Sequence, residues 1–454
     1  MSFTPQVVII GAGAAGMSAA IDLANAGLKV QILEARDRIG GRMFTKHDLE
    51  INAPIELGAE FIHGRSPELW QLLREKNVSI SEVGGDNWCR EDDELRHCDF
   101  FSEVDDILAK MDASGPDESF VDFLHRCFPD SDSEGPRRKK AKRRAISYVT
   151  GFNAADPAKV SAHWLVQEMQ AEEKIEGERA FRSQRGYYDL IEIFRQKLIA
   201  AKIDIQLNTV IENVRWRDGE VEIFGNNGDG KITISTPKLL ITVPAGVLQA
   251  ASRERGAIQF IPELPLEKLS ALAKIEMGKV IRVTLCFHER FWDSLHPSKA
   301  RSETLSDMSF LFSQTGNEWI PTWWTTMPQK YPILVGWAPF RAAEKLSGQG
   351  EDFIKQKALE TLSQLLPIDK QKLENLLKAI YVHDWQNDPF SRGAYSYVKV
   401  GGEDSPAALG ESIENTLFFA GEATDIGGNT GTVHGAIASG KRAANEILSG
   451  SNSF

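Results

Sequence analysis

A glycine-rich loop near the start of the chain has the spacing that binds the diphosphate of a dinucleotide. Gly11, Gly13 and Gly16 follow an apolar run that ends at Ile10. The first glycine permits a tight turn, the second lets the backbone approach a diphosphate, and the third lets a helix pack on a strand. The free N–H groups at the start of that helix then face the phosphate oxygens. This spacing predicts a dinucleotide site.

The elements that must position the loop occur in the required order. Residues 6–10 have the pattern of a short buried strand, residues 17–24 that of a helix opened by the glycine loop, and residues 28–33 that of a second strand. Glu34 ends the second strand, about 20 residues beyond the loop, where a carboxylate accepts hydrogen bonds from an adenosine ribose. The same carboxylate repels a 2′-phosphate, which disfavours NADP. Together these features predict a Rossmann-like unit.

Basic residues follow the second strand. Arg36 and Arg42 flank the pair Gly40–Gly41, and their charges can meet a diphosphate from its other side. A second complete GxGxxG pattern is absent from the sequence. A bound flavin would therefore receive its electrons directly from an organic substrate rather than from NAD(P)H, and these residues favour FAD over NAD.

Three separated blocks of the chain resemble the flavin amine oxidase family, which includes monoamine oxidases, polyamine and spermine oxidases, and the lysine-specific histone demethylase. The blocks are residues 11–45 continuing at 55–64, residues 239–244 with Val210 before them, and residues 418–424 continuing at 431–440. The motifs are closest to those of polyamine or spermine oxidases. The chain lacks the long helical insertion and the extra domain of the demethylase, so chromatin partners are not expected.

The resemblance implies an α/β fold class, α+β overall, with a FAD-binding Rossmann-like domain made of three chain segments. Those segments are residues 1–80, 205–290 and 385–454. The interleaved residues 81–204 and 291–384 are expected to form a substrate-binding domain.

The resemblance also implies which residues bind FAD. The backbone at Glu60 and Phe61 lies beside the isoalloxazine, Val210 meets the adenine, and Glu422 holds the ribityl or diphosphate region. Thr432 begins a helix whose positive end faces the flavin, where the reduced form carries negative charge. The expected set is Gly11, Gly13, Ala15, Gly16, Glu34, Ala35, Arg36, Gly41, Arg42, Gly58, Ala59, Glu60, Phe61, Val210, Trp385, Gly421, Glu422, Thr432 and Val433.

Three residues are candidates for catalysis: Arg282, Tyr395 and His63. Tyr395 falls at the family's aromatic-cage position, although a tyrosine packed in a strand is the alternative. His63 lies where spermine and acetylpolyamine oxidases have a histidine bordering the substrate cavity, and it can orient an amine or relay a proton at neutral pH. The alternative for His63 is a loop histidine that bonds to the backbone.

Three departures from the family pattern carry further expectations. Ala394 stands where monoamine oxidases attach flavin through a cysteine, so FAD is expected to be non-covalent. Thr432 replaces their second cage tyrosine, which argues against monoamine substrates. Arg282 replaces the flavin-facing lysine that is associated with reoxidation by oxygen, and its planar group is permanently protonated. Lys279 cannot take its place, because positions 279 and 282 of a strand face opposite sides unless a bulge intervenes.

Composition narrows the class of protein. The formal net charge of −12 argues against nucleic-acid binding. Neither a signal sequence nor an apolar run that could cross a membrane is visible. Cys89, Cys98, Cys127 and Cys286 are scattered, which predicts a reducing compartment, no disulfide framework and no metal site. A cytoplasmic protein without a membrane anchor is expected.

Several charged and aromatic residues leave alternatives open. Glu172, Glu173 and Glu176 can attract a polycation, but a solvated helix face is favoured. Trp323 and Trp324 either line the pocket or pack a sheet. The basic run at 137–144 is interpreted as the solvated face of a helix that begins at Pro136, with a targeting signal or a polyanion-binding patch as the alternative.

The sequence therefore predicts a FAD-dependent enzyme that oxidises a polyamine-like or other primary or secondary amine to an imine and then an aldehyde, with oxygen giving hydrogen peroxide. The expected partners are the small amine and oxygen or another electron acceptor. One alternative is an amine or amino-acid dehydrogenase that reacts poorly with oxygen because of Arg282. Others are an amino-acid oxidase or desaturase of the same broad fold, and a FAD-binding interaction protein with little turnover.

Overall fold

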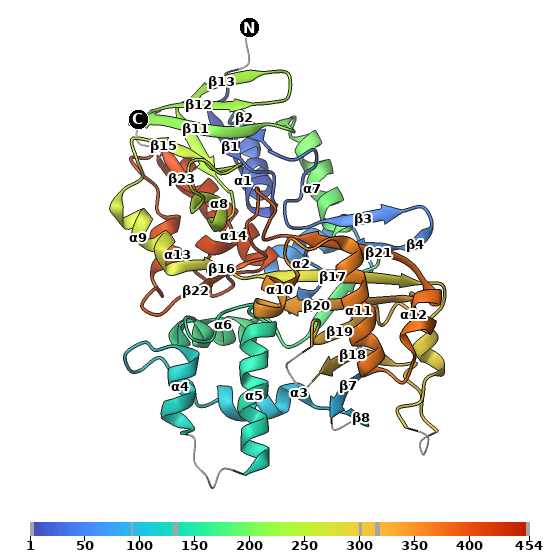
Figure 1. The fold of residues 1–454 in the computed structure, drawn as a ribbon. Coiled ribbons are helices and arrows are strands. Elements are labelled where there is room, and N and C mark those ends of the chain that lie inside the picture. Colours follow the sequence, from blue (N-terminus) through green and yellow to red (C-terminus); the bar gives the residue numbers. More distant parts are fainter. Residues whose placement is uncertain (1–3, 92–93, 130–134, 299–301, 314–317, 451–454) are drawn as a thin grey trace.

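A five-stranded parallel sheet carries the glycine-rich loop. The computed structural model, a mixed α/β fold, describes residues 4–91, 94–129, 135–298, 302–313 and 318–450 (Figure 1). The sheet has the strand order β10-β2-β1-β14-β23. Its strands are β1 Val7–Ile10, β2 Val30–Leu33, β10 Asp204–Gln206, β14 Lys238–Ile241 and β23 Leu417–Phe419. Segments far apart in the sequence thus lie side by side.

Both faces of this sheet are covered, which explains why its strands read as continuous apolar runs. Val7 and Ile9 pack on helices, whereas Val8 and Ile10 face a second sheet, as the period of two requires. The helices are α1 Ala14–Asn25, α7 Tyr188–Ala200 and α14 Val433–Ser449. The second sheet has the order β13-β12-β11-β15, with β11 Val210–Arg217, β12 Glu220–Asn226, β13 Lys231–Thr236 and β15 Gln259–Ile261.

A seven-stranded sheet forms the other large part of the molecule (Figure 1). Its order is β21-β17-β20-β19-β18-β7-β8. The strands are β7 Asp86–Glu91, β8 Glu94–His97, β17 Val280–Phe287, β18 Met308–Ser313, β19 Thr322–Thr325, β20 Ile333–Pro339 and β21 Leu377–Asp384. All eight residues of β17 are buried. Ile281 and Val283 pack against helix α11 Glu351–Leu365, which leaves Arg282 on the opposite face of the sheet.

The remaining elements are short sheets and helices around these two sheets. The short strands are β3 Thr45–Asp48, β4 Ile51–Glu56, β5 Ile62–His63, β6 Ile80–Glu82, β9 Ala180–Ser183, β16 Ile275–Met277 and β22 Ser396–Val398. The helices are α2 Pro67–Glu75, α3 Phe100–Leu108, α4 Phe120–Cys127, α5 Pro136–Gly151, α6 Ala162–Lys174, α8 Ala245–Leu248, α9 Leu266–Lys274, α10 Phe340–Leu346, α12 Lys370–Leu376 and α13 Ser405–Gly410, with 3₁₀ turns at Phe291–Ser294 and Glu422–Thr424.

Most of the predicted elements are confirmed. The βαβ unit is present, and Arg282 lies in a strand as expected. Helix α5 does begin at Pro136, but Arg144 of its basic run is buried and forms an ion pair with Glu91 at 2.9 Å. Among the described residues, none of the helices has the length and apolar character that a membrane crossing needs.

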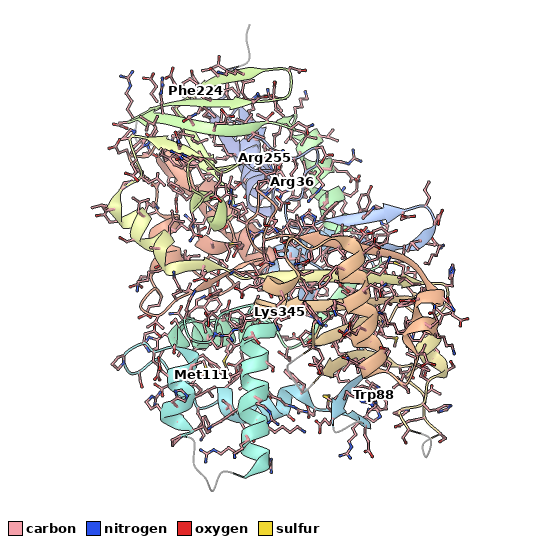
Figure 2. All side chains as sticks on the ribbon, viewed as in Figure 1. Arg36, Trp88, Met111, Phe224, Arg255 and Lys345 are labelled. Carbon is pink, nitrogen blue, oxygen red and sulfur yellow. A yellow bond between two sulfur atoms is a disulfide. The ribbon has the colours of Figure 1, made fainter. Side chains whose placement is uncertain are left out.

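The cysteine prediction was wrong for one pair. Cys89 of β7 and Cys98 form a disulfide between residues separated by 9 positions. Cys89 follows Trp88, which Figure 2 marks at the edge of the seven-stranded sheet. The spacing resembles no common framework, and only the β7–β8 hairpin brings the two side chains together. Cys127 and Cys286 are free thiols.

Thiol counting under denaturing conditions checks this disulfide. Without reductant, two thiols are expected to react, and reduction should raise the number to the chain's four cysteines. A loop of this length constrains the unfolded chain, so reduction is expected to cost about 2–3 kcal/mol of stability. Four reactive thiols before reduction would contradict the pairing.

Candidate active site

The glycines of the first loop have three separate structural roles. Gly11 has φ +108°, and a Cβ there would lie 2.7 Å from Thr242 Oγ1. A Cβ at Gly16 would lie 2.1 Å from the carbonyl O of Gly11, so only glycine lets the helix pack this closely. Gly13 is the N-cap of α1, and a Cβ there meets no atom within 4 Å. This open space at a helix N-terminus fits a diphosphate.

Glu34 joins the end of β2 to this loop. Its Oε2 accepts a hydrogen bond from the N–H of Ala12 at 2.7 Å, and its Oε1 accepts one from the N–H of Arg36 at 2.9 Å. Burial raises the pKa of Glu34, which these two donors oppose. The N–H of Thr209 donates to the carbonyl O of Glu34 at 2.8 Å, which holds the start of β11 at Val210 next to the end of β2. Ala35 follows Glu34 directly and precedes Arg36.

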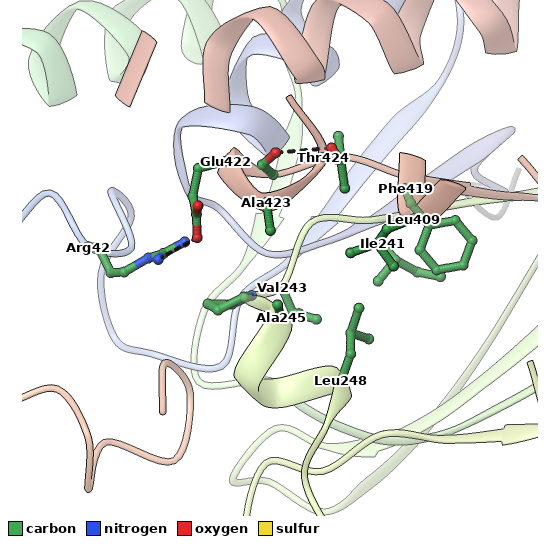
Figure 3. A pocket seen from close by; sticks show the side chains of 13 residues that line it. Arg42, Ile241, Val243, Ala245, Leu248, Leu409, Phe419, Glu422, Ala423 and Thr424 are labelled. Atoms are coloured by element: carbon green, nitrogen blue, oxygen red, sulfur yellow. Dashed lines mark hydrogen bonds and ion pairs between the residues drawn. The ribbon is translucent and has the colours of Figure 1, made fainter. Parts of the chain in front are cut away.

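Arg42 and Glu422 form an ion pair at the other end of the loop region. Arg42 Nη1 donates to Glu422 Oε1 at 2.8 Å and to the carbonyl O of Ala394 at 2.9 Å. Glu422 Oε2 accepts hydrogen bonds from Ser396 Oγ at 2.6 Å and from the N–H of Gly431 at 2.9 Å. The pair borders a pocket that apolar side chains of β14, α8 and β23 also line (Figure 3).

Arg36 is held differently from Arg42. Its Nη2 donates to Asp388 Oδ1 at 2.8 Å, and its guanidinium lies 5.9 Å from the ring centroid of Trp385. Figure 2 marks Arg36 beside the parallel sheet. Trp385 Nε1 in turn donates to the carbonyl O of Leu57 at 2.8 Å. Both arginines are thus positioned by residues of the segment 385–395.

Residues 58–61 run alongside Arg42. A Cβ at Gly58 would lie 1.8 Å from the carbonyl O of Arg42, and the N–H of Ala59 donates to that same oxygen at 3.1 Å. Gly41 has φ +57° and packs against Gly13, since its Cβ would lie 3.3 Å from Gly13 Cα. The glycines therefore bring the two predicted FAD-binding segments into contact.

The third segment begins helix α14 as predicted. Thr432 is the N-cap, and its Oγ1 accepts a hydrogen bond from the N–H of Gly435 at 3.0 Å, which leaves Val433 as the first helical residue. Gly421 has φ +146° and open space at its Cβ position. The open glycines at the N-terminus of α1 and at the cavity, Gly13 and Gly421, fit a flavin dinucleotide, because the cofactor must approach the backbone closely. These residues would hold its diphosphate and ribityl chain.

Tyr395 and His63 meet at Phe152. Tyr395 Oη donates to the carbonyl O of Phe152 at 2.6 Å, and the His63 and Phe152 rings are 5.4 Å apart in a T-shaped arrangement. Burial lowers the pKa of His63 to about 4. The imidazole is therefore neutral at physiological pH, and it does not titrate there as expected from the sequence. That His63 forms a hydrogen bond with the substrate stays a prediction.

A second cavity, missed by sequence reasoning, lies beside these residues. It is lined by Glu168 and Glu172 of α6 together with Tyr148, Phe152 and Asn153. Glu172 is only partly exposed and lines this cavity, whereas Glu173 and Glu176 are exposed, as expected for a solvated surface. The useful signal was the spacing of Glu168 and Glu172, which puts both on one helix face with the buried Leu165.

The acids of this cavity are only partly accessible to solvent. Glu168 Oε1 accepts from Thr430 Oγ1 at 3.2 Å, and its Oε2 accepts from Asn153 Nδ2 at 2.8 Å. Burial, with the charge of Glu172, raises the pKa of Glu168 well above its usual value. Burial beside Glu178 raises the pKa of Glu172 to about 7. Asn153 Oδ1 is buried and has no hydrogen-bond partner among the described residues.

Arg282 lies beside residues 58–60, on the face of β17 opposite to the one that packs on α11. Its Nη1 donates to the carbonyl O of Gly58 at 3.1 Å, and Nη2 forms an ion pair with Glu60. Lys279 does not replace it, because its ammonium pairs with Glu344 at 2.7 Å on an exposed surface. Trp324 Nε1 donates to Glu60 Oε2 at 3.0 Å, while Trp323 packs in the sheet core.

The sequence and fold were compared with those of known proteins. A rice (Oryza sativa subsp. japonica) polyamine oxidase 4 is 28% identical over 97% of this chain and 88% of its own. Human lysine-specific histone demethylase 2 is also 28% identical over 97% of this chain, which spans 53% of that protein. The fold matches putrescine oxidase bound to putrescine with a TM-score of 0.77 and 20% identity, over 98% of this chain and 99% of that one.

A second solved structure supports the same fold. Cyclohexylamine oxidase from Brevibacterium oxydans superposes with a TM-score of 0.76 at 19% identity, covering 99% of this chain and 100% of that one. The family model for flavin-containing amine oxidoreductases matches residues 14–125 and 109–448. With its glycine cradle shaped for FAD, this chain belongs to the flavin-containing amine oxidoreductase family and is an oxidoreductase.

Proposed function

We propose that the chain uses FAD to oxidise a polyamine-like or other primary or secondary amine. The amine loses two electrons and two protons to become an imine, and water hydrolyses the imine to an aldehyde and a smaller amine or ammonia. Oxygen takes up the two electrons and two protons as hydrogen peroxide. The observation that carries this proposal is the acid-lined cavity beside Tyr395 and His63.

The cavity suits an ammonium group. Glu168, Glu172 and the unpartnered Asn153 Oδ1 offer acceptors, and Tyr148 and Phe152 add aromatic rings, which attract cations. Among the described residues, Glu168 and Glu172 form no ion pair with a basic side chain, and their pKa values are raised, so an ammonium would supply the positive partner. A polyamine has a second nitrogen that can occupy this position while another nitrogen reacts.

The amine nitrogen that reacts requires surroundings that favour its neutral form, unlike the ammonium group at the acids. FAD accepts a hydride equivalent from the carbon next to nitrogen, and that nitrogen must be neutral to form the imine. Tyr395 and the neutral His63 are both only partly exposed, and a site of low polarity disfavours a protonated amine. We propose that Tyr395 and His63 orient the neutral nitrogen, and that Arg282 contributes a positive charge on the flavin side.

The raised pKa of Glu172 predicts a pH dependence. Its carboxyl is neutral below about 7 and ionised above, so a cationic substrate binds better as the pH rises. We expect kcat/KM for a polyamine to fall about tenfold per pH unit below that value, in excess of any slope due to the substrate's own ionisation. The substitution Glu172→Gln should remove this additional slope. An unchanged profile in that variant would contradict the assignment.

One observation favours a second candidate function, an amine dehydrogenase with poor oxygen reactivity. Arg282 is permanently protonated and already committed to Glu60 and to the carbonyl of Gly58. It therefore has no proton to give during oxygen reduction. In that case the electrons pass to another acceptor.

Product counting under air separates the two functions. Incubation with putrescine, spermidine and spermine should give one aldehyde and one hydrogen peroxide for each amine group oxidised. Aldehyde formation that needs an added dye as acceptor, without peroxide, would support the dehydrogenase. No aldehyde under either condition would contradict both.

A further inference from the structure

Arg282 belongs to a buried cluster of four side chains, with Glu60, Trp324 and Arg182. Arg282 Nη2 donates to Glu60 Oε2, and Trp324 Nε1 donates to the same oxygen at 3.0 Å. Arg182 Nε donates to the other carboxylate oxygen, Oε1, at 2.8 Å. The exposed fractions of the side chains are 4% for Arg282, 7% for Arg182 and 7% for Glu60. One carboxylate thus sits between two buried arginines.

Arg182 is fixed by contacts of its own. Its Nη2 donates to the carbonyl O of Thr325 at 3.1 Å, and its Nη1 donates to that of Met327. The guanidinium also lies 4.5 Å from the ring centroid of Phe61. All three kinds of nitrogen are therefore occupied, so Arg182 forms a rigid support for Glu60 rather than a mobile counterion.

The cluster carries one net positive charge. Burial opposes ionisation of Glu60, but Arg282, Arg182 and the Trp324 hydrogen bond outweigh it and lower the pKa of the carboxyl. Guanidinium groups do not deprotonate in proteins. Two cations and one anion therefore remain charged across the working pH range.

This charge lies beside residues 58–61, the segment whose backbone is expected to contact the flavin. Arg282 Nη1 donates to the carbonyl O of Gly58, and Glu60 is two residues further along the same segment. Ala59 in between is bonded to Arg42, which borders the cavity of the FAD site. The backbone of residues 58–61 thus connects the cluster to the cofactor site.

We infer that Glu60 and Arg182 are positioning residues, which fix Arg282 as a permanent cation at the flavin and thereby favour the reduced, negatively charged cofactor. A preorganised charge aimed at developing negative charge stabilises it without reorganisation. The inference rests on the proposed function only for the place of FAD and not for the identity of the amine.

The test measures the ratio of reduced to oxidised flavin at a fixed potential, set by a mediator dye without any amine. Arg282→Met should lower this ratio about tenfold, which for a two-electron couple is about 30 mV. Glu60→Gln gives the decisive sign. A residue that acted only as a negative charge would raise the ratio when neutralised, whereas a residue that positions Arg282 lowers it. We expect a fall of up to about tenfold.

Two further variants keep this test decisive. In an Arg282→Met background, Glu60→Gln should no longer lower the ratio, since nothing is left to position. Trp324→Phe removes one donor to Glu60 without changing charge, and a fall of about twofold is expected. If Glu60→Gln fails to fold, the Trp324→Phe variant tests the same support of Arg282. A ratio that rises in Glu60→Gln, or that Trp324→Phe leaves unchanged, overturns the inference.

Arg290→Met is the matched control. Arg290 is a buried arginine with an exposed fraction of 8%, and it pairs with Asp293 and donates to the carbonyl O of Ser306 outside the flavin region. Its loss should reduce thermal stability without moving the flavin ratio. The mediator dye sets the flavin ratio without any amine. If the proposed function is wrong, amine turnover will be absent while the changes in the ratio of reduced to oxidised flavin are still observed.

Discussion

Replacing Gly13 by aspartate is expected to give a folded protein that purifies without FAD. Gly13 is the N-cap of α1 with φ −78°, and nothing lies within 4 Å of a Cβ there. Aspartate is a favoured N-cap, so α1 should persist. Its carboxylate, however, occupies and repels the place where the diphosphate meets the helix. We expect FAD affinity to fall at least about 100-fold, which corresponds to about 2.8 kcal/mol.

Flavin absorbance of the purified protein and FAD titration of the apoprotein measure this effect. Gly350→Asp is the control, because Gly350 is the N-cap of α11 with φ −68° and equally open space. That variant should retain its full complement of FAD. Normal FAD content in Gly13→Asp would mean that the diphosphate does not bind at α1.

Substitution of both cavity acids should have the second large effect. Removing the charges with Glu168→Gln and Glu172→Gln leaves the cavity shape nearly unchanged but removes its attraction for an ammonium. A hydrogen bond to a charged group contributes about 1.5–3 kcal/mol, so losing two should lower kcat/KM for spermidine about 100-fold or more. A monoamine, which has no second ammonium, should change by less than about threefold.

Steady-state kinetics with paired substrates measure this selectivity. Glu173→Gln is the control on the same helix, since Glu173 is exposed and lies outside the cavity. It should leave both substrates unaffected. Equal losses for spermidine and the monoamine in the double variant would indicate a general structural defect and contradict a polycation site.

The cofactor cradle was predictable because its signals are local. Gly11, Gly13 and Gly16 lie on one turn, and Glu34 follows at the end of the next strand, so spacing alone placed them together. Thr432 at the start of α14 was predicted from resemblance and confirmed as an N-cap. The residues of each signal lie within one βαβ unit or at one helix start, so packing from distant segments is not needed to place them.

The substrate side was not predictable in the same way. Glu168 belongs to the cavity only because Thr430 and Asn153, from other parts of the chain, lie against it. Glu60 was expected to contribute backbone alone, yet its side chain pairs with Arg282 and with Arg182, which no sequence pattern indicated. Such contacts join segments that are far apart in the sequence, and a single sequence contains no signal for that.

Anaerobic mixing with amines tests the central claim most directly. The purified, FAD-containing protein is mixed without oxygen with spermidine, spermine, putrescine, benzylamine and an amino acid, and the oxidised-flavin absorbance is followed. We predict rapid bleaching by at least one polyamine and much slower bleaching by benzylamine, because only the polyamine can place a second ammonium between Glu168 and Glu172. Flavin that stays oxidised with every amine would contradict amine oxidation, and faster bleaching by benzylamine would contradict the polycation site.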